Sequence, residues 1–180
     1  MKDKRKPKGK SPAGEKISTE EKLAREAIRE VLESQDRADI ICMDIQQNGM
    51  FTPFITIDGH TFKSLAYYGT GVIGLEMYER LSLKPEELEE FREKVEKADK
   101  TFEPKAGEEK SMRMGISKKP EHLSVFALVH VKEENGKEKM VEDLRSKLSG
   151  VITTVSMLYF GMFDGPDDAT ETDPTPKPTV

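Results

Sequence analysis

The sequence predicts an α+β domain in which helices pack on an antiparallel sheet of about four strands. Three observations carry this prediction. Apolar residues recur at three- and four-residue spacing in several segments, as in amphipathic helices. Residues 122–132 alternate between two faces, and Asn48-Gly49 separates two apolar runs as in a β-hairpin. The expected order of elements is α-β-β-α-(α)-β-β-α.

The two ends of the chain differ in composition from its middle. Residues 1–17 hold seven basic and two acidic side chains, and residues 164–180 hold five acidic side chains, one lysine and four prolines. Neither end has enough apolar surface to offset the entropy cost of ordering, so we expect both to be disordered. A single domain is therefore expected over 18–163. Its net charge is −6, because the ends contribute +5 and −4 to a total of −5.

The first element of this domain is a helix near 18–34. Ser18 followed by Glu21 matches a capping box, in which each side chain bonds to the other residue's backbone amide. A single apolar stripe follows at helical spacing, formed by Ala24, Ala27, Ile28, Val31 and Leu32.

A hairpin is expected next, with strands at 40–46 and 51–57. Asn48-Gly49 favours a two-residue type I′ turn, because both central residues of that turn need positive φ. Such a turn would pair Ile40 with Ile57 and Cys42 with Ile55. Pro53 has no amide hydrogen for the ladder, so its strand should lie at an edge or carry a bulge.

Two helices are expected to follow. The first covers 62–82, where Leu65, Tyr68, Val72 and Leu75 keep helical spacing. The second is short and acidic, and it begins near Pro85, a residue that fits the first turn of a helix. It ends near residue 100, and its narrow apolar stripe consists of Leu88, Phe91 and Val95.

Two strands and a long final element complete the domain. Strands are predicted at 111–117 and 122–132, the second as a central strand because both of its faces are apolar. The final segment, 141–162, keeps helical spacing throughout, which favours one helix. Gly150 and the β-branched residues after it leave open a helix followed by a strand.

The end of this last segment supplies the main functional prediction. Its apolar side chains can fill the core or form an assembly surface, and a homodimer interface can do both. The candidate interface residues are Leu158, Tyr159, Phe160, Met162 and Phe163. We therefore expect a non-enzymatic interaction module that forms homo-oligomers or binds a protein partner.

A second hypothesis is a nucleotide-binding protein or enzyme. Residues 69–74 read Gly-Thr-Gly-Val-Ile-Gly, which resembles the dinucleotide-binding fingerprint G-x-G-x-x-G. In that fingerprint a buried strand precedes the glycines, and a second strand ending in an acidic residue follows about 20 positions on. Residues 61–68 do not read as a buried strand, and the chain continues instead with Pro85 and a Glu/Lys-rich helix. The glycines are expected instead to allow close packing. His60 could act beside them as a general base oriented by Asp58, or it could be an ordinary loop histidine.

Other reactive side chains give weaker signals. Cys42 lies among apolar residues and is expected to be a buried thiol. His122 and His130 show no metal-ligand spacing with another histidine or cysteine. We expect no catalytic residue, metal or cofactor from these positions.

A third hypothesis is a nucleic-acid accessory protein that uses the basic tail, residues 1–17, to contact phosphates. Against it, the domain is acidic and its sequence shows no basic stripe with interleaved aromatic residues. No signal peptide or membrane-spanning run is evident, so we expect a cytoplasmic protein that does not enter a membrane.

The expected order of elements resembles that of roadblock and longin-type domains. That resemblance covers only the order of helices and strands, not a sequence motif. It implies a role in assembly rather than catalysis.

Overall fold

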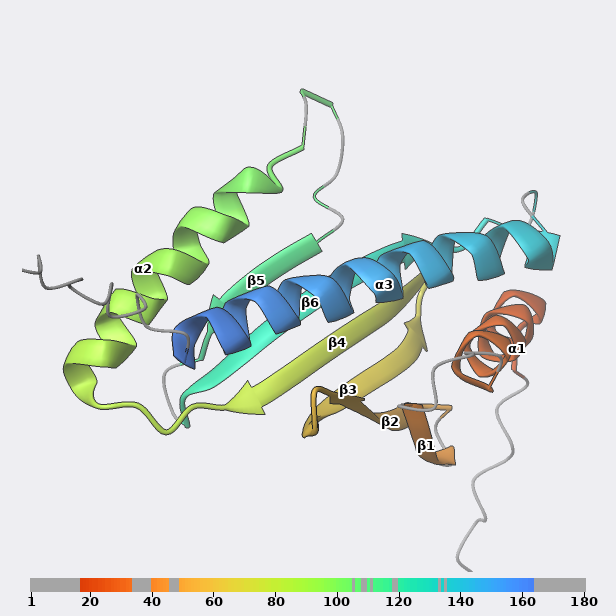
Figure 1. Ribbon diagram of the computed structural model, residues 1–180. Helices are drawn as coiled ribbons and strands as arrows, with labels where there is room; N and C mark the ends of the chain where they lie inside the picture. Colours follow the sequence, from red (N-terminus) through yellow and green to blue (C-terminus); the bar gives the residue numbers. More distant parts are fainter. Residues whose placement is uncertain are drawn as a thin grey trace, which may run out of the picture.

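The computed structural model describes residues 17–33, 40–45, 49–104, 106–107, 110, 112–117, 120–132, 134 and 136–163. The predicted tails, apart from Ile17, lie outside these residues. Within these described residues, three helices and six strands follow one another (Figure 1). They are α1 (Thr19–Glu33), β1 (Ile40–Ile45), β2 (Phe51–Ile57), β3 (His60–Gly69), β4 (Val72–Arg80), α2 (Pro85–Thr101), β5 (Met112–Ile116), β6 (His122–His130) and α3 (Gly136–Phe163).

The strands form one antiparallel sheet in the order β1-β2-β3-β4-β6-β5. The first four strands are neighbours in both sequence and space. The chain then passes through α2 to the far edge and returns as β6, which lies between β4 and β5. The predicted α+β class is therefore confirmed, as is the central position of the strand beginning at His122, although the sheet has six strands rather than about four.

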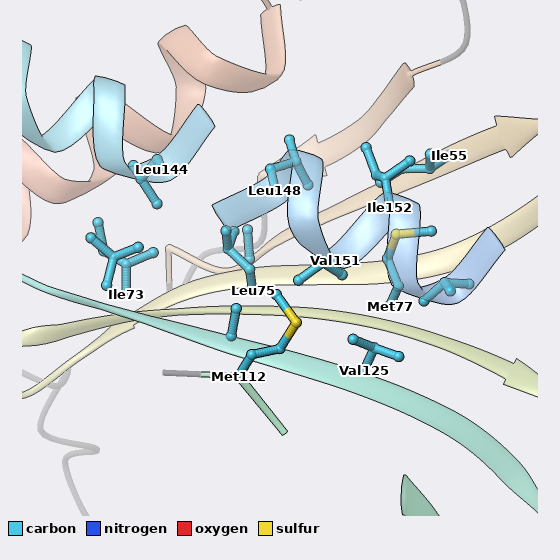
Figure 2. Close-up of a cluster of buried hydrophobic side chains, with 14 of the residues drawn as sticks. Ile55, Ile73, Leu75, Met77, Met112, Val125, Leu144, Leu148, Val151 and Ile152 are labelled. Atoms are coloured by element: carbon cyan, nitrogen blue, oxygen red, sulfur yellow. The ribbon is translucent and has the colours of Figure 1, made fainter. Parts of the chain in front are cut away.

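The three helices bury their apolar side chains in one core on one face of the sheet. Figure 1 shows α3 lying across the sheet with α1 beside it. Figure 2 shows Leu148, Val151 and Ile152 of α3 above the strands. Leu144, Val151 and Val155 are at most 1% exposed, so the apolar side of α3 forms the centre of the core.

The helix α2 lies along the outer edge of β5 and occupies polar groups that an edge strand leaves unpaired. Asp99 Oδ1 accepts a hydrogen bond of 2.8 Å from the Met114 amide, and Arg92 donates one of 3.2 Å to the Ile116 carbonyl. Lys110 Nζ donates to Asp99 Oδ2 at 2.6 Å. Burial raises the pKa of Asp99, but the hydrogen bonds from Lys110 and Met114 outweigh it and hold the pKa below its ordinary value.

The predicted helix at 62–82 is wrong, because these residues form β3 and β4. The two strands join through Thr70-Gly71, with Gly71 at φ 79°. Asp58 and Gly59, at φ 48° and 80°, make the preceding two-residue turn, whose positive φ values are those of type I′. Helical spacing and period-two alternation both fit this apolar segment, and the cross-strand partners on each side favoured the strands.

The predicted register of the first hairpin is also wrong. Ile40 pairs with Ile55 and Cys42 with Pro53, a shift of two residues, and the register changes again between Cys42 and Ile45. The extra residue of this irregularity lies in β1, opposite Pro53, and β2 lies between β1 and β3, so the strand of Pro53 itself neither carries the bulge nor forms an edge. The buried Ser64 hydroxyl donates to the Pro53 carbonyl.

The remaining helices agree with the sequence predictions. The Ser18 hydroxyl accepts a hydrogen bond of 3.1 Å from the Glu21 amide, which is one half of the expected capping box, whereas the Glu21 carboxylate pairs with Arg25. Every residue of the predicted α1 stripe is buried. In α2, Phe91 and Val95 are buried, and the Lys84 amide donates to Glu87 at 2.9 Å. The segment left open between helix and strand, 141–162, is wholly helical within α3. Among the described residues, no helix is both long and apolar enough to cross a membrane.

Candidate functional site

The predicted interface residues lie at the C-terminal end of α3, where that helix crosses the sheet near the start of β3. Leu158, Tyr159 and Phe160 are half-buried and pack against the core. Met162 and Phe163 belong to the last turn of α3, and their side chains lie outside the described part of the structure. The first three residues therefore already serve the fold.

An aromatic cluster anchors this end of α3 to the sheet. The His60 ring stacks on Tyr159 with their centroids 4.5 Å apart, and it meets Phe62 edge-on at 4.7 Å. Phe62 also contacts Tyr159 and Phe160, with centroids 5.0 and 6.2 Å away. Aromatic pairs at these separations add to the energy of burial alone. His60, which the sequence analysis considered as a base, is thus part of a packing cluster.

The acidic neighbour of His60 is Glu79 on β4 rather than the expected Asp58. Glu79 Oε2 lies 3.6 Å from His60 Nε2, beyond hydrogen-bond distance, and the buried Nε2 has no hydrogen-bond partner among the described residues. Burial raises the pKa of Tyr159, and the nearby Glu79 carboxylate raises it further. A phenol with a raised pKa stays neutral at pH 7, as a packing role requires.

The outward side of α3 contrasts with this packed side. Residues 148–163 contain no charged side chain, although 35% of the whole chain is charged. The exposed positions of this segment recur every four residues and form what we call the outward stripe, namely Ser149, Thr153, Met157 and Gly161. Met157 is 73% exposed, the most exposed of the large apolar side chains described. Loss of charge with retained apolar character is typical of the centre of a protein interface.

The glycine string does not form a phosphate site of the dinucleotide-binding kind. Gly69 and Gly71 belong to the β3–β4 hairpin, so no helix begins there to bind a pyrophosphate. His60 is at the other end of β3, about 30 Å away at strand spacing. Gly74 pairs with Tyr67 across the hairpin, and a Cβ at Gly74 would lie 2.6 Å from Tyr67 Cζ. The nucleotide hypothesis therefore lacks the geometry from which it arose.

The sequence analysis missed the second face of the sheet, which no described helix covers. We call it the uncovered face. Cross-strand pairing sets Lys63 between Phe54 and Tyr78, and sets Phe126 between Glu76 and Arg113. Basic and aromatic residues thus alternate across the strands, whereas the sequence analysis looked for them only along the chain.

Other predicted positions add no site. Cys42 lies in β1, but its side chain is outside the described part. His122 and His130 stand at the two ends of β6. Within the described ranges, no three His, Cys, Asp or Glu side chains come close enough to hold a metal ion. A cavity of about 10 Å³ beside Ser64 and Leu148 has room for no more than a single water molecule.

No protein-family model matches this chain, and no curated protein sequence is significantly similar to it.

Proposed function

We propose that this chain is a non-enzymatic interaction module that self-associates through the outward stripe of α3. The observation that carries the proposal is the uncharged, exposed surface along the second half of α3, with Met157 at its centre. Small residues flank Met157, so a second helix can approach closely. Residues four apart form the ridges by which two helices interlock, commonly at about −50°.

The packing of the opposite side of α3 supports the same proposal. Val151 and Val155 are at most 1% exposed, and Tyr159 is stacked on His60. The helix is thus held rigidly and needs no rearrangement to present Met157. A preformed surface avoids the entropy cost of ordering on binding.

Light scattering or sedimentation of the full chain at increasing concentration tests the proposal. A two-fold interface contains each residue twice, so Met157→Asp places two charges in a desolvated contact. We expect it to weaken a dimer by about 100-fold or more, since each copy loses roughly 1.5 kcal/mol or more of apolar burial. Ser149→Asp provides a second charge on the same stripe.

Ile17→Asp is the matched control. Ile17 is 54% exposed and directly precedes α1. Glu20 of that helix accepts a hydrogen bond from Tyr68, and Tyr68 lies at the opposite end of β3 from His60. The substitution Ile17→Asp therefore adds one charge at an exposed apolar position far from the outward stripe. A monomer at high concentration, or a dimer equally stable in all variants, would contradict the proposal.

A further inference from the structure

The uncovered face carries apolar and aromatic side chains at positions that are normally polar on a solvent-exposed sheet surface. An antiparallel sheet with one wet face normally alternates apolar residues inward with polar residues outward. Here the inward positions of β6 are at most 4% exposed, as expected, but the outward positions include Phe126 and Leu128. Across the neighbouring strands Tyr67, Tyr78 and Phe54 also point outward.

Three rings of this face, those of Tyr78, His122 and Phe126, lie within reach of one another. Tyr78 is opposite Ser124, so its diagonal neighbours on β6 are His122 and Phe126. Tyr78 and His122 have ring centroids 6.2 Å apart in an edge-on arrangement. Diagonal neighbours in a sheet are about 7–8 Å apart, which places Tyr78 and Phe126 as two adjacent platforms. All three of these side chains are half-buried.

The charge of this face is opposite to that of the domain. Among its described side chains, Lys63, Arg80 and Arg113 are exposed, and Glu76 is the acidic residue between them. Glu76 accepts a hydrogen bond of 2.6 Å from Ser124. Lys63 and Arg80 form no ion pair within the described part of the chain. The face is thus locally positive, whereas the chain as a whole carries −5.

We infer that the uncovered face binds single-stranded nucleic acid. Exposed rings on a sheet stack bases without regard to sequence, and neighbouring cations bind the phosphates between them. A duplex cannot use the rings, because its bases are already stacked. A second copy would bring the same three cations against each other. The inference is independent of the outward stripe, which lies on the helical side of the sheet.

Fluorescence anisotropy of the full chain with labelled oligothymidylate and oligouridylate of about 15 nucleotides tests this inference. Lys63→Glu is expected to reduce the slope of log affinity against log salt by about one or more. Phe126→Leu keeps an apolar side chain but removes a stacking ring, so we expect affinity to fall by about fivefold or more. A hairpin duplex of the same length should bind more weakly than either single strand.

Controls of matching chemistry separate the face from the rest of the molecule. Lys97→Glu makes the same charge change at an exposed position of α2, and Phe102→Leu removes a ring that is 40% exposed after that helix. Arg80→Glu repeats the charge test should Lys63→Glu fail to fold. Binding that persists equally in the face variants and the controls would assign it to the basic tail and overturn the inference. So would absence of binding, or a face variant that instead changes the oligomeric mass.

Discussion

Gly74→Ala distinguishes the observed hairpin from the helix that the sequence predicts at 62–82. In the structure an added Cβ at Gly74 lies 2.6 Å from Cζ and 2.8 Å from Cε1 of Tyr67, closer than carbon atoms can approach. The Tyr67 ring must move away or stay strained. Overpacking a filled core costs about 1–3 kcal/mol, and we expect about 1–2 kcal/mol here because the clash is with the far end of a half-buried side chain. It outweighs the roughly 0.5–1 kcal/mol that alanine otherwise gains over glycine within a strand.

The effect of Gly74→Ala on the free energy of unfolding is expected to change sign between the two backgrounds of a double-mutant cycle. Gly74→Ala alone should destabilise the chain by about 1 kcal/mol, as the balance of these two terms. In a Tyr67→Ala background the clash is absent, so the same change should stabilise by about 0.5–1 kcal/mol. The coupling energy is then about 1.5–2 kcal/mol, well above the error of such cycles.

Urea unfolding of the four proteins, followed by circular dichroism, measures this coupling. Gly115→Ala is a control in a strand, because a Cβ added to Gly115 would meet no atom within 4 Å beyond its immediate chain neighbours. A Gly74→Ala variant that is more stable in both backgrounds would refute the reasoning. That result is what a helix over 62–82 would give, because alanine is favoured over glycine in a helix whatever stands at Tyr67.

Three further predictions concern stability. Asp99→Ala leaves the Met114 amide without its acceptor and should cost about 1–3 kcal/mol in urea unfolding at pH 7. Because the pKa of Asp99 is lower in the folded chain, the contribution of Asp99 to the free energy of unfolding should be complete at neutral pH and should disappear as the pH falls below about 4. An equal cost of Asp99→Ala at pH 7 and at pH 2.5 would contradict this expectation. Leu144 is 1% exposed, so Leu144→Ala should cost about 2–5 kcal/mol of stability. Met157 is 73% exposed, so Met157→Ala should change the stability of the monomer by less than about 0.5 kcal/mol. Similar losses at both sites would contradict the orientation of α3 on the sheet. Ser18→Ala should cost about 1 kcal/mol by removing the cap of the Glu21 amide, and thermal melts that overlay those of the unsubstituted chain would show that the cap is not formed.

Some features of the candidate site could be predicted from the sequence, and others could not. The apolar, uncharged character of 148–163 is readable directly from the sequence, and it led to the prediction of an interface within 158–163. Which side of it faces outward was not, since that depends on where α3 meets the sheet. Leu158 and Phe160 pack against the core, and Met157 is left exposed.

The uncovered face was beyond sequence reasoning for a different reason. Its rings and cations are neighbours only across strands, for example Lys63 with Tyr78 and Arg113 with Phe126. Such pairs become visible only when the register is known. The Asp58-Gly59 dipeptide, a strong hairpin signal, was the one local clue that could have revealed the β2–β3 pair.

Local sequence signals were sufficient for those elements in which several signals agree with one another. These are α1 with its cap at Ser18, α2 after Pro85, and the alternating strand β6. Contacts between distant parts of the chain set the state of 62–82, the register of β1 on β2, and the side of the sheet that the helices cover. The physical reason is that a strand obtains its ladder hydrogen bonds and most of its side-chain contacts from other strands and helices, whereas a helix obtains its hydrogen bonds from its own turns.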